Sequence, residues 1–100
     1  MYGSKMKSEE TDHLFEAILS LQNEEECYAF FSDLCTFGEI QAMSQRLQVA
    51  KMLCEGNTFS QISKETGVSS ATITRVNKEL HYGSDGYRTA IARLKEKHAE

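Results

Sequence analysis

The chain has no proline and no tryptophan, and its six glycines are scattered over 100 residues. Collagen-like and low-complexity chains are rich in proline and glycine, so this composition excludes them. The longest apolar runs are far too short to cross a bilayer, and residues 1–10 lack the hydrophobic segment of a signal peptide. We therefore predict a cytoplasmic protein without membrane association.

Groups that could hold a metal or catalyse a reaction are also scarce. The three cysteines include no CxxC pair and fit a reducing compartment, and the three histidines lack metal-ligand spacing. No phosphate-binding loop and no Ser/His/Asp or Cys/His set can be proposed, so we predict no enzymatic activity, no metal and no cofactor. The side chains concerned are Cys27, Cys35 and Cys54, expected in the core, and His13, His81 and His98, expected at the surface.

The net charge of −4 by itself argues against binding to nucleic acid. The charge is, however, unevenly distributed along the chain. Residues 1–58 carry four basic and ten acidic side chains, which gives −6. Residues 59–100 carry seven basic and five acidic side chains, which gives +2. A weak positive field is thus confined to the second half of the chain, which is where a nucleic-acid site would be sought.

The spacing of apolar residues predicts an all-α chain with a flexible arm over residues 1–10 and a single domain over residues 11–100. Asn23 interrupts the first helical pattern, and Gly38 is predicted to end the second helix as a C-cap. The expected helices are Thr11–Gln22, Glu24–Phe37, Glu39–Glu55, two short helices within Phe59–Leu80, and a last helix that follows a turn over His81–Gly86.

The apolar arcs of the first three predicted helices are wider than a small monomer requires. The arc of the third helix covers about two-thirds of its circumference, which predicts that other helices surround it. Arg46 lies within that arc. Either a partner charge or an anion compensates its guanidinium, or its stem lies on apolar surface while its head reaches water.

The stretch from Thr58 to Leu80 has the signature of a helix-turn-helix unit. Thr58 and Gln61 fit a capping box, Gly67 supplies the turn, and Ser69 is a good N-cap for the second helix. A helical wheel places the apolar residues of the second helix on one face and small, hydroxyl and basic residues on the other. The inward residues are Ile62, Thr66, Val68, Ile73, Val76 and Leu80.

The outward face of the second helix suits the major groove of DNA. A methyl group of Ala71 or Thr74 can meet a thymine methyl, and Arg75 or Lys78 can reach a guanine or a phosphate. An ordinary helical hairpin with a solvated polar face is the alternative. The predicted contacts are Ser69, Ser70, Ala71, Thr72, Thr74, Arg75 and Lys78 at the groove, with Thr58, Ser60, Gln61 and Lys64 near phosphates.

The run GVSSATITR over Gly67–Arg75, with RLQVAKMLCEGNTFSQISKETG before it, resembles the Trp repressor family. It is most similar to the YerC/YecD type of this superfamily. The resemblance implies a six-helix all-α fold and an intertwined homodimer, in which the N-terminal helices of both subunits interlock. It also implies two recognition helices roughly 34 Å apart on a near-palindromic operator.

The resemblance further implies an effector pocket. Two arginines that hold the corepressor tryptophan in the family match Arg46 and Arg75. A glycine that lies against the indole matches Val76, and a serine that receives the amino group matches Glu79. We expect the side chains of Val76 and Glu79 to fill this space, so that tryptophan is not sensed, whereas another small effector between the arginines is possible.

These features together predict a sequence-specific, dimeric DNA-binding transcriptional regulator that acts as a repressor by covering a promoter. The alternative is a non-enzymatic helical protein-interaction module without DNA binding, which uses the acidic half as its working surface. A steep dependence of DNA binding on salt would distinguish the two, because phosphate contacts release counterions.

Overall fold

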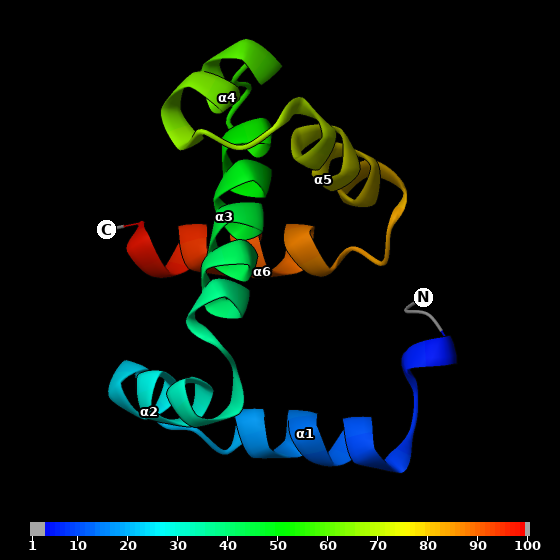
Figure 1. Cartoon of the computed structure of the whole chain (residues 1–100), viewed down its shortest axis with the longest axis vertical. Coiled ribbons are helices and arrows are strands. Elements are labelled where there is room, and N and C mark those ends of the chain that lie inside the picture. Colours follow the sequence, from blue (N-terminus) through cyan, green and yellow to red (C-terminus); the bar gives the residue numbers. More distant parts are fainter. Residues whose placement is uncertain (1–3, 100) are drawn as a thin grey trace. The chain divides into compact units, whose positions relative to one another are not determined.

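The computed structural model describes residues 4–99, and this part of the chain contains helices and no strand (Figure 1). The prediction of an all-α fold with six α-helices is confirmed. No helix among the described residues is both long enough and apolar enough to span a bilayer. A short 3-10 helix covers Ser4–Met6, and it is followed by α1 Glu9–Leu19, α2 Glu24–Leu34, α3 Phe37–Cys54, α4 Phe59–Thr66, α5 Ser70–Tyr82 and α6 Gly86–His98.

The described residues divide into two compact units, 4–41 and 42–99. The first unit holds the 3-10 helix, α1, α2 and the beginning of α3. The second holds the remainder of α3 with α4, α5 and α6. The single domain expected over residues 11–100 stays a prediction.

Side-chain caps fix the helix starts in the first unit. The backbone N–H of Thr11 donates to Ser8 Oγ at 3.0 Å, and that of Glu26 donates to Asn23 Oδ1 at 2.8 Å. Because Ser8 is the N-cap, α1 begins two residues earlier than predicted. The residues of the expected arm before Ser4 lie outside the described part. The predicted break at Asn23 is confirmed as a helix start.

The start of α3 contradicts the prediction for Gly38. A capping box joins Thr36 and Glu39: the Thr36 N–H donates to Glu39 Oε1 at 2.7 Å, and the Glu39 N–H donates to Thr36 Oγ1 at 3.1 Å. The backbone hydrogen bond from Thr36, and after it a hydrogen bond from the Thr36 side chain to the carboxylate, hold the pKa of the Glu39 carboxyl below its usual 4.5. Gly38 therefore lies in the first turn of α3 and does not cap α2.

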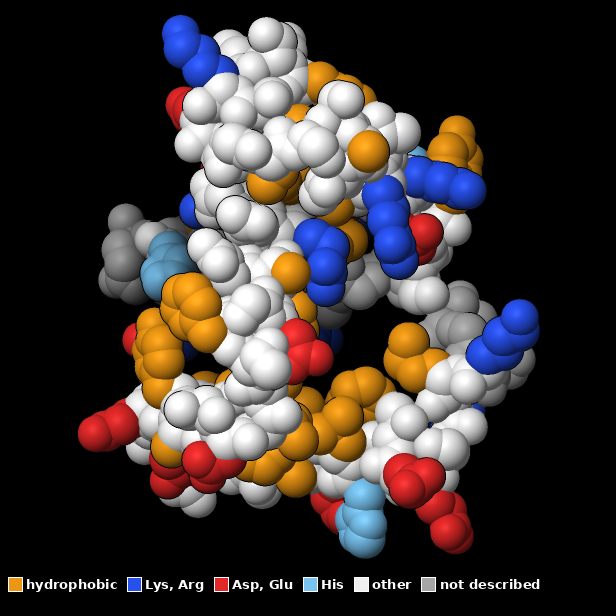
Figure 2. Space-filling model, in the orientation of Figure 1, with side chains coloured by type: hydrophobic (Ala, Val, Ile, Leu, Met, Phe, Trp, Pro, Cys, Tyr) orange, Lys and Arg blue, Asp and Glu red, His pale blue; other side chains and the backbone are white. Residues whose placement is uncertain are grey.

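The helices α1 and α2 bury none of their residues. The exposed fraction is 84% for Leu19, 81% for Phe37 and 73% for Tyr28. Figure 2 shows hydrophobic side chains at the surface over these helices, with acidic groups around them. The first unit by itself thus leaves large apolar side chains exposed.

The core lies in the second unit. Val49, Ala50 and Met52 at the end of α3 form its floor, and residues of α4, α5 and their turn complete it. Asn57 ends α3 with two bonds of 3.1 Å to the Met52 carbonyl, one from its backbone N–H and one from its side-chain amide. The buried residues from the later elements are Ile62, Val68, Ile73 and Val76, with Leu53, Tyr87 and Ile91 packed against them.

One expectation for α3 is wrong for the single chain: Cys54 is exposed and not a core residue. Arg46 is exposed and has no ion pair among the described residues, which agrees with the alternative that its head reaches water. The other cysteines, Cys27 and Cys35, are half-buried. Within the second unit, the α3 residues that join the core are Val49, Ala50, Met52 and Leu53, and Cys54 in the same last turn is left exposed. The surface position of His13, His81 and His98 is confirmed.

Candidate nucleic-acid interface

The start of α4 is fixed by the predicted capping box. The Thr58 N–H donates to Gln61 Oε1 at 2.7 Å, and the Gln61 N–H donates to Thr58 Oγ1 at 3.1 Å. Two backbone donors that a helix start leaves free are satisfied in this way. The rest of α4 is short and amphipathic, with Ile62 wholly buried. The buried Ile62 and the capping box both hold α4 in place.

A three-residue turn joins α4 to α5. Gly67 adopts a φ of 75°, a left-handed conformation that costs glycine little, and its N–H donates to the Ser63 carbonyl at 2.9 Å. Val68 turns inward and is buried. Its N–H donates to Thr66 Oγ1 at 3.3 Å. The turn is thus bonded to α4 through both Gly67 and Val68, which sets the direction in which α5 departs.

The helix α5 separates its two faces as the sequence predicts. Ile73, Val76 and Leu80 are 0%, 1% and 4% exposed. The polar face opposite them consists of exposed side chains, and Figure 1 shows α5 beside α4 at the end of α3. The exposed residues of this face are Ser70, Ala71, Thr74, Arg75 and Lys78.

The hydroxyls of Ser69 and Thr72 have partners within the chain. Ser69 Oγ accepts from the Thr72 N–H at 3.2 Å, which makes Ser69 the N-cap of α5, and the two hydroxyl oxygens are also 3.2 Å apart. Thr72 is half-buried. A base or phosphate that approached these hydroxyls would therefore compete with the cap, whereas Ser70 is free of this bond.

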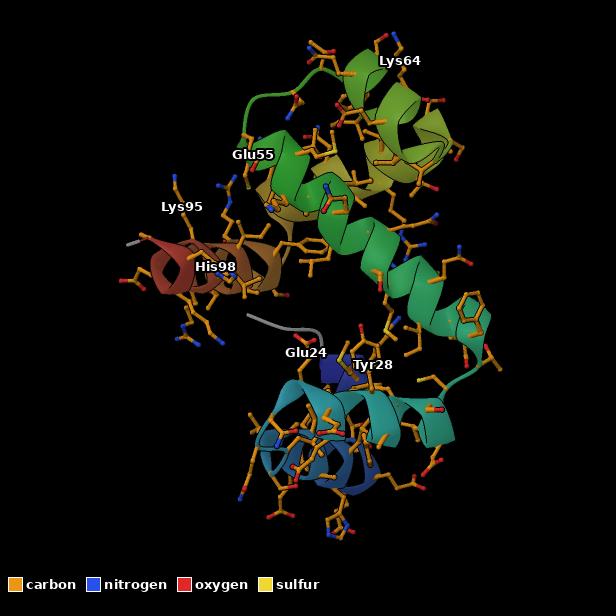
Figure 3. All side chains as sticks on the ribbon, turned by 90° about the vertical axis from the view of Figure 1, so that its left-hand side faces the viewer. Glu24, Tyr28, Glu55, Lys64, Lys95 and His98 are labelled. Carbon is orange, nitrogen blue, oxygen red and sulfur yellow. The ribbon has the colours of Figure 1, made fainter. Side chains whose placement is uncertain are left out.

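On α4 the predicted contact residues are exposed. Thr58, Ser60, Gln61 and Lys64 all reach solvent, although Gln61 Oε1 is held by the capping box. Figure 3 shows Lys64 projecting from α4 at one end of the second unit. The cap leaves the amide nitrogen of Gln61 as the donor available to an anion.

The four residues of the expected effector pocket are in unlike environments. Arg46, Arg75 and Glu79 are exposed, whereas Val76 is part of the core. Among the described residues, Glu79 forms no ion pair with either arginine. The described residues also contain no cluster of three or more metal-ligating side chains.

One contact near α5 has no signal in the helical patterns. Arg88, in the first turn of α6, donates from Nε to the Leu80 carbonyl at 2.9 Å. The bond joins a side chain to a backbone carbonyl eight residues earlier, so helical periodicity does not predict it. The sequence indicates only that a basic residue follows a turn with glycine at both ends, Gly83 and Gly86. The bond holds the end of α5 to the start of α6.

Known proteins with similar sequences and structures were found for this chain. A family model described as Trp repressor protein matches residues 9–95. YerC of Bacillus subtilis (strain 168), itself described as uncharacterized, is 55% identical over 100 residues that cover 100% of this chain and 96% of YerC.

Two crystal structures are similar over nearly the whole chain. A TrpR-like protein from Eubacterium eligens ATCC 27750 has a TM-score of 0.89 and 48% identity, and the match covers 98% of this chain and 99% of that one. A protein from Staphylococcus aureus has a TM-score of 0.89 and 51% identity, with 94% of each chain covered.

Proposed function

The chain belongs to the Trp repressor family, and from this premise we propose that it is a sequence-specific, dimeric repressor of transcription that acts in the cytoplasm. It binds a near-palindromic operator in double-stranded DNA and covers a promoter. Neither an enzymatic step nor a cofactor is part of this proposal. The observation that supports it most is the exposed polar face of α5, held outward by three buried side chains on its other side.

The exposed face offers the chemistry that base edges require. The methyl groups of Ala71 and Thr74 can meet thymine methyls in the major groove, and Arg75 or Lys78 can donate to guanine or to phosphate. Ser60, Gln61 and Lys64 on α4 are suited to phosphates beside the groove, with Thr58 at the helix start and with Ser69, Ser70 and Thr72 at the start of α5. Phosphate contacts fix the register, and the groove contacts read the sequence.

The test is a pair of single replacements, Thr74→Ala and Lys78→Gln, on an operator obtained by selecting bound genomic fragments. Thr74→Ala is expected to weaken operator binding by about 1–3 kcal/mol, the size of one lost base contact, without changing the oligomeric state. Lys78→Gln is expected to lower the slope of log K against log salt by about 0.9, because one phosphate contact is lost. Gel shift and fluorescence anisotropy over a salt series measure both.

Lys97→Gln, on the exposed surface of α6, is the matched control and should keep the wild-type slope. Unchanged operator affinity for both α5 variants would contradict the placement of this helix in the groove. If the wild-type protein bound no genomic fragment even at low salt, a protein-interaction module without DNA binding would replace the proposal.

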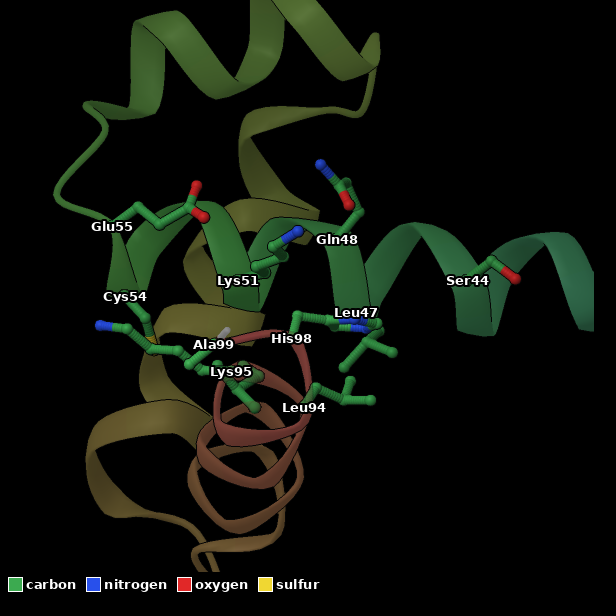
Figure 4. A pocket seen from close by; sticks show the side chains of 11 residues that line it. Ser44, Leu47, Gln48, Lys51, Cys54, Glu55, Leu94, Lys95, His98 and Ala99 are labelled. Carbon is green, nitrogen blue, oxygen red and sulfur yellow. The ribbon is translucent and has the colours of Figure 1, made fainter.

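The homodimer in this proposal is supported by two uncovered surfaces. One is the apolar surface of α1, α2 and Phe37 in the first unit. The other is a groove within the second unit between α3 and α6, where Leu47 and Leu94 face each other (Figure 4). Lys51 and Lys95 stand at its edge. In a homodimer, the first unit of each copy, which is apolar and acidic, would pack against the groove of the other copy.

We expect the regulator not to respond to tryptophan. Val76 is 1% exposed and packs in the core, where the family's ligand site has a glycine, so an indole would have to displace it. Isothermal titration calorimetry should show no binding of tryptophan at micromolar concentrations, and operator affinity should not change when tryptophan is added. A micromolar Kd would refute this expectation, while another small effector between Arg46 and Arg75 remains compatible with it.

A further inference from the structure

The connection between α5 and α6 contains two residues with constrained backbones, Gly83 and Asp85. The last turn of α5 leaves carbonyl oxygens without helical partners, and Gly83 satisfies one of them by donating its N–H to the Glu79 carbonyl at 2.8 Å. A Cβ atom at Gly83 would collide with that same carbonyl oxygen. Asp85 adopts a φ of 65°, which is uncommon for a residue other than glycine. The backbone therefore follows one constrained path out of α5.

Arg88 closes this path. Its Nε donates to the Leu80 carbonyl at 2.9 Å, in a partly buried position. The guanidinium places a positive charge at the C-terminal end of α5, where the helix dipole favours cations. Leu80 is 4% exposed and belongs to the inward face of α5, while Tyr87, the residue before Arg88, packs against the core. The bond thus connects the last turn of α5 to a fixed point on α6.

We propose that Arg88 is a positioning residue for DNA recognition, which holds the angle of α5 on its core through the Leu80 carbonyl and thereby sets sequence specificity. This inference rests on the proposed function, since it assumes that α5 reads the operator. The start of α5 is held by Ser69 and by the turn at Gly67, so Arg88 provides the constraint at the other end of the same helix. Base contacts along α5 require both ends to be fixed, whereas non-specific attraction to phosphates does not.

The experiment compares Arg88→Met, which removes the donor and keeps most of the side chain's length, with Arg88→Lys, which keeps the charge but not the planar donor. Arg93→Met is the matched control, because Arg93 is on the same helix, is exposed, and has no hydrogen bond or ion pair among the described residues. For each variant, affinity for the selected operator and for unrelated DNA is measured over a salt series. Circular dichroism establishes a temperature at which each variant is fully folded.

The expected result for Arg88→Met is a specificity ratio lowered by about tenfold, the size of one lost base contact, with affinity for unrelated DNA and the salt slope unchanged. Arg88→Lys should retain part of the ratio, and Arg93→Met all of it. A salt slope lowered by about 0.9 would overturn the proposal, because it would make Arg88 a phosphate contact. An unchanged ratio in a fully folded Arg88→Met protein would also overturn it.

The two proposals fail in different ways. If wild-type protein does not prefer any operator over unrelated DNA, the proposed function is wrong and the role of Arg88 falls with it. If wild-type protein shows the preference and Arg88→Met shows the same preference, only the role of Arg88 is wrong. Should Arg88→Met not fold, the Arg88→Lys variant decides, because a lost planar donor must still lower the ratio.

Discussion

The replacement Ile73→Ala is expected to lower the free energy of unfolding by about 2–5 kcal/mol, the usual range for isoleucine to alanine in a core. Ile73 is wholly buried, together with Val49 of α3 and Ile62 of α4. Total stabilities of small proteins are about 5–15 kcal/mol, so this one change removes a large share. The loss of stability should affect α4 and α5 together, because both helices pack on the same core residues.

Urea denaturation followed by circular dichroism measures this effect. Protomer concentration must be equal in all samples, since the proposed dimer formation would make apparent stability depend on concentration. Thr74→Ala is the control. It is the adjacent residue of the same helix and is exposed, so its effect on unfolding should stay within about 0.5 kcal/mol. Equal urea midpoints for Ile73→Ala and wild type would show that α5 does not depend on this core.

If the proposed homodimer forms through the first unit, the double replacement Leu19→Gln with Phe37→Asp is expected to convert it into monomers. These side chains are 84% and 81% exposed in the single chain, and burying such a side chain contributes roughly 1.5–3 kcal/mol. The proposed dimer would bury four of them, so the replacements are expected to make dissociation easier by at least roughly 6 kcal/mol, about four orders of magnitude in Kd.

The two substitutes are chosen to preserve the helices. Glutamine is a good helix former, and an aspartate at the first residue of α3 is favoured by the helix dipole. Sedimentation velocity gives the mass of each species, and Tyr82→Gln serves as the comparison, since Tyr82 is 86% exposed but lies at the end of α5. A double variant that stays dimeric at wild-type concentrations would locate the dimer interface elsewhere.

The local rules of helix formation accounted for most of the fold. The capping box at Thr58, the left-handed turn at Gly67 and the cap at Ser69 were all readable from short spacings, because each depends on residues within three or four positions. At Gly38 two such rules make opposite predictions. Glycine suggests a helix end, but Thr36 and Glu39 form a capping box around it, and two hydrogen bonds outweigh the lower helix propensity of one glycine.

Features that depend on a distant neighbour were not predictable in the same way. A wheel shows that Arg46 shares a face with apolar residues, but it cannot show how far along α3 the covering helices extend. Cys54 lies in the last turn of α3 beside core residues and is nevertheless exposed, because the covering helices bury only part of that turn. The bond from Arg88 to the Leu80 carbonyl depends on the path of the chain between α5 and α6, and that path is set by Gly83 and Asp85 together.

The packing of α4 and α5 on α3 has a consequence for grafting these two helices onto another protein. Their buried side chains meet Val49, Ala50 and Met52, which precede α4 in the chain and belong to another helix. Residues 58–82 alone would lose the α3 side of this core, so that Ile62, Ile73 and Val76 would be partly exposed to water. A graft onto a different scaffold must therefore include the last turns of α3, because α4 and α5 do not form a complete core by themselves.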